Sequence, residues 1–174
     1  MVAIVLPPSV PVEGNSKIWW VPTLADPNAP KLTELAAVSA VDITCYLTKD
    51  GSFKDAMEQA TYVDARACSA EETELFGAIK RSLEDLIYVY QPQAAALAAD
   101  NAAEEKMVTG TTGYFVVRRG LPYQTAVAVG QFVSVVGATL GGRVEVGDAS
   151  NSVYKRRQKV SLSLPYVEKV ALAA

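Results

Sequence analysis

The 174-residue chain contains no histidine. Histidine is the commonest general base, the commonest zinc ligand and the usual partner of a serine or cysteine nucleophile. Carboxylate pairs occur at 71–72, 84–85 and 104–105, but nothing in the sequence groups these pairs or places a nucleophile beside them. We therefore expect no enzymatic activity, no metal site and no cofactor.

Cysteine is scarce as well, since only Cys45 and Cys68 are present. Two cysteines without histidine are too few for a zinc site. A disulfide between them requires Cα atoms within about 7 Å of each other. We expect both thiols to be reduced and buried as small hydrophobic side chains, with a disulfide as the alternative.

Long apolar runs and strong charge are also missing. The chain has no stretch of 18 consecutive apolar residues, so we expect no membrane partner. The net charge of −3 is too small to create a strong basic field. The single basic cluster, Lys155, Arg156, Arg157 and Lys159, lacks interleaved aromatic platforms for bases. We interpret it as a subunit contact or a solvated strand edge, with a nucleic-acid contact as the alternative.

What the sequence does contain is a series of short β-prone runs separated by glycine and proline. The predicted strands are 17–21, 42–48, 61–66, 114–118, 125–138, 143–146 and 154–164. We expect the valine-rich run 125–138 to be a core strand bent at Gly130, followed by a turn at Gly141-Gly142. Residues 49–60 are predicted to form a loop.

The helical signals are fewer. The alanine-rich segment 93–107 follows Pro92 and predicts one helix, and 32–38 predicts one or two helical turns. Residues 69–83 are ambiguous, because a Ser69–Glu72 capping box and apolar residues at helical spacing compete with a β-rich continuation. Together these patterns predict a mainly β fold, a β-barrel or sandwich with one packed α-helix.

The first 16 residues are rich in proline and predict an extended arm ahead of a single domain at 17–174. Ile4 and Leu6 gain little by packing in a monomer, so we expect them to contact a neighbouring subunit, with a disordered leader as the alternative. Trp19 and Trp20 are expected to divide between the core and an interface, where tryptophan is enriched.

Five short motifs occur in a fixed order along the chain, and their order and spacing are more informative than any one of them. They are Ile18-Trp19-Trp20-Val21-Pro22-Thr23 with Pro27 and Pro30, Asp42-Ile43-Thr44-Cys45-Tyr46-Leu47, Asp64-Ala65-Arg66-Ala67-Cys68, Tyr88-Val89-Tyr90-Gln91-Pro92-Gln93, and Gly113-Tyr114-Phe115-Val116-Val117-Arg118-Arg119-Gly120. In this order the chain resembles the major tail protein, or tail tube protein, of phages with long non-contractile tails, especially phages that infect actinobacteria. The resemblance covers about residues 17 to 162.

The resemblance implies a tail-tube type of β-fold whose subunits form six-fold rings, and these rings stack into a hollow tube in the virion tail. Its implied partners are other copies of itself, the tape-measure protein, other tail proteins, and viral DNA that passes through the lumen without sequence-specific binding. Assembly would take place in the host cytoplasm. The family pattern also favours strands over residues 69–83, and we adopt it there.

The resemblance further implies a long loop that reaches the adjacent ring, and 49–60 is the candidate. The inter-ring candidates are Lys49, Asp50, Phe53, Lys54, Asp55, Met57 and Glu58. The subunit-interface candidates are Ile4, Leu6, Trp19, Trp20, Lys155, Arg157 and Lys159. A weakly acidic subunit suits a DNA conduit, so we expect the three basic residues not to dominate the lumen wall. The competing hypotheses are another virion ring or decoration protein, and a small-ligand-binding β-barrel.

Overall fold

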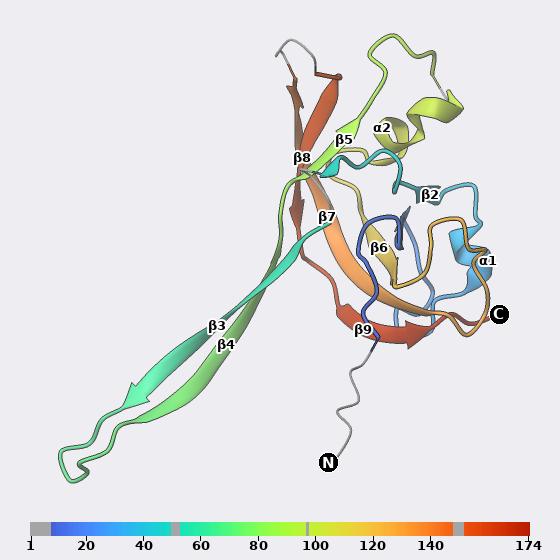
Figure 1. The fold of residues 1–174 in the computed structure, drawn as a ribbon. Helices are drawn as coiled ribbons and strands as arrows, with labels where there is room; N and C mark the ends of the chain where they lie inside the picture. The colour runs from blue at the N-terminus through green and yellow to red at the C-terminus, as the bar shows by residue number, and fades with distance from the viewer. Residues whose placement is uncertain (1–7, 50–52, 97, 148–151) are drawn as a thin grey trace.

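The computed structural model describes residues 8–49, 53–96, 98–147 and 152–174. A curled antiparallel sheet forms the body, and a long two-stranded hairpin projects from it (Figure 1). The strands are β1 (Ser16–Val21), β2 (Val41–Asp42), β3 (Asp55–Asp64), β4 (Thr73–Leu83), β5 (Leu86–Val89), β6 (Thr112–Arg119), β7 (Phe132–Val146), β8 (Lys155–Ser161) and β9 (Tyr166–Ala171). The helical segments are α1 (Leu32–Leu35), η2 (Ala99–Asn101) and α2 (Ala102–Lys106). The predicted mainly β fold with a packed helix is confirmed.

β7 is the strand around which the large sheet is organised. The sheet runs in the order β2-β1-β6-β7-β8-β5, and β9 also pairs with β7. β6 occupies one edge of β7, while β9 and then β8 occupy the other. The link between β8 and β9 stays on this second edge, where the Gly137 N–H donates to the Pro165 carbonyl at 3.0 Å. β8 and β9 therefore behave as one bent strand antiparallel to β7.

Residues 41–48 connect the two ends of this curled sheet. β2 pairs with β1 at one end, and Leu47 pairs with Tyr88 of β5 at the other. Between these points Asp42 Oδ1 accepts hydrogen bonds from the Thr44 N–H at 3.0 Å and the Thr44 hydroxyl at 2.6 Å. A carboxylate that captures the backbone two residues on favours a turn. The strand predicted here is therefore wrong beyond Asp42.

The centre of the sheet is buried on both faces. Trp20 is 0% exposed in the core inside the curl, and its neighbour Trp19 is 5% exposed in the core outside it. Successive residues of a strand point to opposite faces, so tandem tryptophans supply one side chain to each core. Burial on both faces also explains why Phe115, Val116 and Val117 are all apolar. Both tryptophans thus lie in the interior of the subunit instead of at a surface.

The structure corrects the prediction of a strand over 125–138. β7 begins only at Phe132, because residues 120–131 form a loop held by the buried Arg118. Its guanidinium donates to the carbonyls of Pro122 and Thr125, each at 2.9 Å. Burial lowers the pKa of Arg118, and the negative charge of Asp42 opposes this shift. The loop backbone is thus pinned to the sheet without joining it.

The predicted turn at Gly141-Gly142 is also wrong. β7 continues through both glycines, with a shift of its register against β8 between Leu140 and Arg143. Glycine permits such an irregularity within a strand, so the same residue type fits a bulge as well as a turn. β9 was not predicted from the sequence, although it covers one end of β7.

The helix predicted at 93–107 is much shorter in the structure. Helical geometry begins at Ala99, and α2 ends at Lys106. The Asn101 side-chain oxygen accepts a hydrogen bond from the Gln91 N–H at 3.0 Å. In a continuous helix these residues would lie about 15 Å apart, so the contact requires a loop between them. Alanine favours helix locally but supplies too little apolar area to hold one against the body.

A carboxylate on α2 joins this helix to the strands. The Tyr88 hydroxyl of β5 donates to Glu104 Oε2 at 3.1 Å. Glu104 Oε1 lies 3.1 Å from Arg143 Nη1 and 3.0 Å from Arg156 Nε, the latter an ion pair without the alignment of a hydrogen bond. Glu104 is 15% exposed, so two cations compensate a partly buried charge. Burial raises the pKa of Tyr88 to about 12.

A tight contact between β7 and the β8–β9 link gives the first prediction. A Cβ atom at Gly137 would overlap the Leu164 side chain and lie 3.0 Å from the Leu164 carbonyl carbon, whereas a Cβ at Gly142 would meet nothing within 4 Å. We expect Gly137→Ala to lower the free energy of unfolding by about 1–3 kcal/mol. Gly142→Ala, in the same strand, should change it little. Equal effects in denaturant titrations would contradict this assignment of the contact.

The raised pKa of Tyr88 predicts a loss of stability at high pH. Between the ordinary tyrosine pKa of 10.0 and the folded value of about 12, the unfolded chain loses the phenolic proton while the folded chain keeps it. The free energy of unfolding should therefore fall as the pH rises through this window. Tyr88→Phe should fall less steeply, whereas Tyr154→Phe, which removes an exposed hydroxyl, should match the wild type. Denaturant unfolding from pH 9 to 12 measures all three slopes.

Candidate functional site

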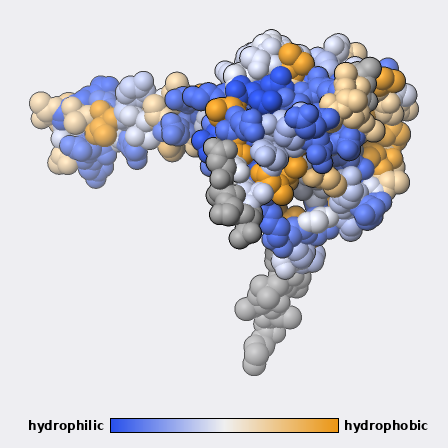
Figure 2. Space-filling model, turned by 90° about the horizontal axis from the view of Figure 1, so that it is seen from above, coloured by the Kyte–Doolittle hydropathy of each residue, from blue (hydrophilic) through white to orange (hydrophobic). Residues whose placement is uncertain are grey.

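The most prominent surface feature is the β3–β4 hairpin, which extends well beyond the body (Figures 1 and 2). Its strands pair with each other over 55–64 and 73–83, with a register shift between Gln59 and Thr61. The strand assignment for 73–83 is confirmed. The loop predicted over 49–60 is wrong from Asp55 onward, since β3 begins there.

The helix-like spacing in β4 has a simple origin. Ile79 and Leu83 are four residues apart, an even number that also places them on one face of a strand. The register shift brings Phe76 to this face as well, opposite Thr61. The supposed capping serine lies in the hairpin turn, where the Ser69 hydroxyl accepts a hydrogen bond from the Glu71 N–H at 3.1 Å.

The hairpin exposes large apolar side chains. Six of them are exposed by half or more: Met57, Tyr62, Val63, Leu75, Phe76 and Ile79. The register puts four of these, Met57, Val63, Phe76 and Ile79, on one face, which we call the apolar hairpin face. Phe76 is 76% exposed. Large exposed apolar side chains gathered on one face are typical of an interaction site.

The base of the hairpin is fixed to the body by polar contacts. The Tyr166 hydroxyl of β9 donates to Asp55 Oδ2 at 2.9 Å, and Arg119 Nη2 of β6 lies 3.4 Å from Asp55 Oδ1. On β4, Arg81 lies 3.1 Å from Glu168 and 4.1 Å from the centre of the Tyr166 ring. Burial raises the pKa of Tyr166, and the hydrogen bond to Asp55 raises it further. The arm therefore leaves the body in a defined direction.

The structure separates the predicted inter-ring residues. Met57 and Glu58 lie on the exposed hairpin, whereas Phe53 is half-buried with its ring centre 5.3 Å from that of Phe115. Lys54 pairs with Glu84 at 3.4 Å. Asp55 is engaged at the hairpin base, Lys49 contacts Glu13 at the surface at 3.0 Å, and Asp50 lies outside the described residues.

The predicted basic row lies on β8. Lys155, Arg157 and Lys159 share one face of the strand, and Arg156 points to the other, toward Glu104 and the Tyr90 ring. This alternation matches the prediction. Gln158, on the same face as Arg156, is fully buried, so that face points into the subunit. Ile4 and Leu6 of the arm lie outside the described residues.

The cysteine prediction is wrong in one respect. Cys45 and Cys68 are both free thiols, as expected, but both are exposed instead of buried. Cys68 lies in the hairpin turn and Cys45 in the turn that follows β2, positions where a small residue faces water.

Neither a metal-binding cluster nor a membrane-spanning helix occurs in the described ranges. No three acidic or cysteine side chains there lie close enough together to hold a metal ion. Within the same ranges, none of the helices has the length and apolarity needed to span a bilayer. The interior of the curled sheet is filled by large side chains, with Trp20, Tyr88 and Phe115 each 0% exposed. That packing does not favour a ligand-binding barrel.

Sequence reasoning missed the apolar hairpin face as a functional surface. The available signal was weak, because 55–64 and 73–83 mix apolar, polar and charged residues without a regular alternation. Two such runs joined by a short polar segment are typical of a hairpin. The helical spacing in 75–83 obscured this pattern.

Comparison with known families decides the identity. A family model described as phage tail tube protein matches residues 5–174. The chain belongs to the phage tail tube protein family. No curated protein matches the chain. This tail tube protein is therefore a structural, non-enzymatic subunit of the tail in the virion, and tail tube proteins self-assemble into the tube.

The contacts at the hairpin base give a third prediction. Tyr166→Phe keeps the ring beside Arg81 but removes the hydrogen bond to Asp55. Because one such bond contributes about 1 kcal/mol, we expect amide exchange to accelerate about fivefold at 55–57 and 81–83 in the unassembled subunit. Tyr62→Phe, farther along the hairpin, is the matched control. Unchanged exchange at the base in Tyr166→Phe would show that this bond does not hold the arm.

Proposed function

We propose that this subunit forms six-fold rings that stack into a hollow tube, and that the β3–β4 hairpin packs on a neighbouring subunit. The exposed apolar hairpin face is the observation that carries this proposal. In the described part of the chain, β3 and β4 pair only with each other. An isolated two-stranded hairpin is marginally stable in water, so contact with a second copy supplies the burial that the subunit alone does not.

The register of the hairpin supports the direction in which it packs. Its apolar face is continuous at the base with Leu83, which belongs to the core inside the curl. Its other face carries Glu58 opposite Lys80 near the base and Tyr62 opposite Leu75 toward the tip. We infer that the apolar hairpin face, on which Phe76 is the most exposed side chain, lies against a neighbour. Of the residues predicted for the inter-ring role within 49–60, Met57 is the one that lies on the apolar hairpin face.

The partners proposed for the assembled tube follow from its charge and family. A net charge of −3 suits a conduit through which viral DNA slides without sequence-specific contacts. The tape-measure protein and other tail proteins complete the proposed set, and assembly is proposed to take place in the host cytoplasm. The motif order from Ile18 to Gly120 supports a phage with a long non-contractile tail that infects actinobacteria.

The apolar hairpin face gives the fourth prediction, which tests assembly. Phe76→Asp and Ile79→Asp place charges on side chains that are 76% and 56% exposed. We expect both variants to fold with the wild-type melting temperature and to lose tube formation by about tenfold or more, because a charge in an apolar contact is strongly unfavourable. Negative-stain electron microscopy and sedimentation measure the assembled fraction.

Val38→Asp is the matched control, because Val38 is 91% exposed but lies on the body beside α1. It should assemble like the wild type. Hairpin variants that form tubes of normal length and yield would overturn the proposed role of the hairpin. A wild-type protein that remains monomeric at high concentration would overturn self-assembly of the isolated subunit itself.

A further inference from the structure

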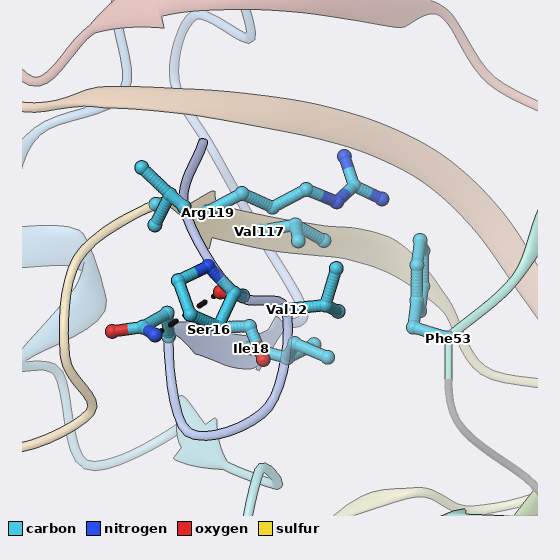
Figure 3. A pocket seen from close by; sticks show the side chains of 10 residues that line it. Val12, Ser16, Ile18, Phe53, Val117 and Arg119 are labelled. Atoms are coloured by element: carbon cyan, nitrogen blue, oxygen red, sulfur yellow. Dashed lines mark hydrogen bonds between the residues drawn. The ribbon is translucent and has the colours of Figure 1, made fainter. Parts of the chain in front are cut away.

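An apolar pocket of about 260 Å³ opens where the N-terminal segment crosses β1 and β6. Figure 3 shows Val12, Ile18 and Val117 grouped around it, with Phe53 at one end and the Arg119 side chain above. Arg119, which lines it, contacts Asp55 at the base of the hairpin, but none of the four side chains of the apolar hairpin face lines the pocket. It is therefore a second surface that the packing of the hairpin does not account for.

The pocket is a place where the core reaches the surface. Ile18 and Val117 form its floor and are 6% and 2% exposed members of the core inside the curl. Phe53 packs against that same core. The rim is formed by Val10 and Val12, which are 56% and 85% exposed. An apolar occupant would extend the core across this rim and shield both valines from water.

The chain itself supplies a segment of matching chemistry. Residues 1–7, which precede the described part of the chain, read Met-Val-Ala-Ile-Val-Leu-Pro and carry no charged side chain. They connect through Pro8 and Ser9 to the pocket rim at Val10. Apolar residues in such a position gain stability only if they find an apolar surface.

The prolines decide between the subunit's own pocket and that of another copy. Proline fixes φ, and a residue that precedes proline favours extended backbone, which applies to Leu6, Pro7 and Val10. A segment of seven residues with such backbone would span about 22 Å at 3.1 Å per residue. This length favours a pocket on a neighbouring copy, because an extended segment would enter the adjacent pocket only by reversing its direction.

We propose that residues 1–7 of one copy occupy the pocket lined by Val10, Val12, Ile18, Phe53 and Val117 in a second copy. This proposal rests on the self-assembly proposed above. An arm that enters a pocket elsewhere on the next molecule is a head-to-tail contact, and repetition of such a contact builds rings or filaments. It gives Ile4 and Leu6 a defined binding partner and links subunits independently of the hairpin.

Disulfide trapping tests the contact directly. In a Cys45→Ser, Cys68→Ser background, which changes only exposed thiols, one tagged chain carries Leu6→Cys and a second carries Val12→Cys. After mixing and oxidation with copper phenanthroline, we expect a cross-linked product that contains both tags. Val38→Cys, outside the pocket, should give at least about tenfold less product with Leu6→Cys, because cross-linking requires the two Cα atoms to approach within about 7 Å.

Each outcome is decisive. A disulfide within a single chain that carries both substitutions, formed at high dilution, would place the arm in its own pocket and overturn the proposal. Tubes that assemble normally without the two-tag product would overturn the arm contact but leave the tube function standing. If the wild-type protein forms no tubes, the cross-link is read on the concentrated protein, where its presence supports the arm contact and its absence overturns it.

A charge variant supplies a second, independent readout. Val12→Asp alters an 85% exposed side chain, so we expect the melting temperature of the unassembled subunit to be unchanged. Tube yield should fall about tenfold, because the introduced carboxylate opposes burial of an apolar arm. Deletion of residues 1–7 should reduce yield to the same extent, and the deletion combined with Val12→Asp should reduce it no further. Additive losses would show that arm and pocket act on different partners.

Discussion

Backbone pairing along β7 is the constraint on which the rest of the subunit depends. β7 needs partners on both edges, and it finds β6 on one and the bent β8–β9 strand on the other. The curl of the sheet then brings β1 and β5 close enough for residues 41–48 to pair with both. The edges of β1 and β5 are thus partly paired inside one chain. The two buried cores follow from this arrangement, since a central strand covered on both faces must be apolar at consecutive positions.

The hairpin stands outside that constraint. β3 and β4 satisfy one edge each by pairing with one another, and their faces carry apolar side chains that the body does not cover. The contacts of Asp55 and Arg81 fix the base but do not extend along the arm. The subunit therefore divides into a body with two buried cores and an arm whose large apolar side chains stay exposed.

The sequence predicted the body better than the arm, for physical reasons that particular residues illustrate. β1 and β6 were recognisable because their apolar residues are dictated by burial within the chain. The 42–48 strand failed because one side-chain contact, from Asp42 to Thr44, outweighed the alternation of its neighbours. The 93–107 helix failed because alanine composition reports local preference and not tertiary burial. The hairpin was ambiguous because the body does not cover its apolar residues, so burial within the chain does not impose a regular pattern on them.

Exposed apolar surface on a free subunit carries a risk of indiscriminate association, and the hairpin limits this risk by its charge. Asp64, Glu71, Glu72 and Glu74 cluster around the turn, and Arg66 pairs with Asp64 at 3.0 Å. An acidic end repels the same end of another copy, so two hairpins do not zip together through their tips. β9 is irregular as well, because Lys169 adopts a positive φ of 52° where the register with β7 shifts. Such an irregularity disfavours regular pairing with a strand of another copy. Contacts between like surfaces are thereby disfavoured. Contacts between unlike surfaces remain open to the subunit, and these are the contacts that build a ring and then a tube.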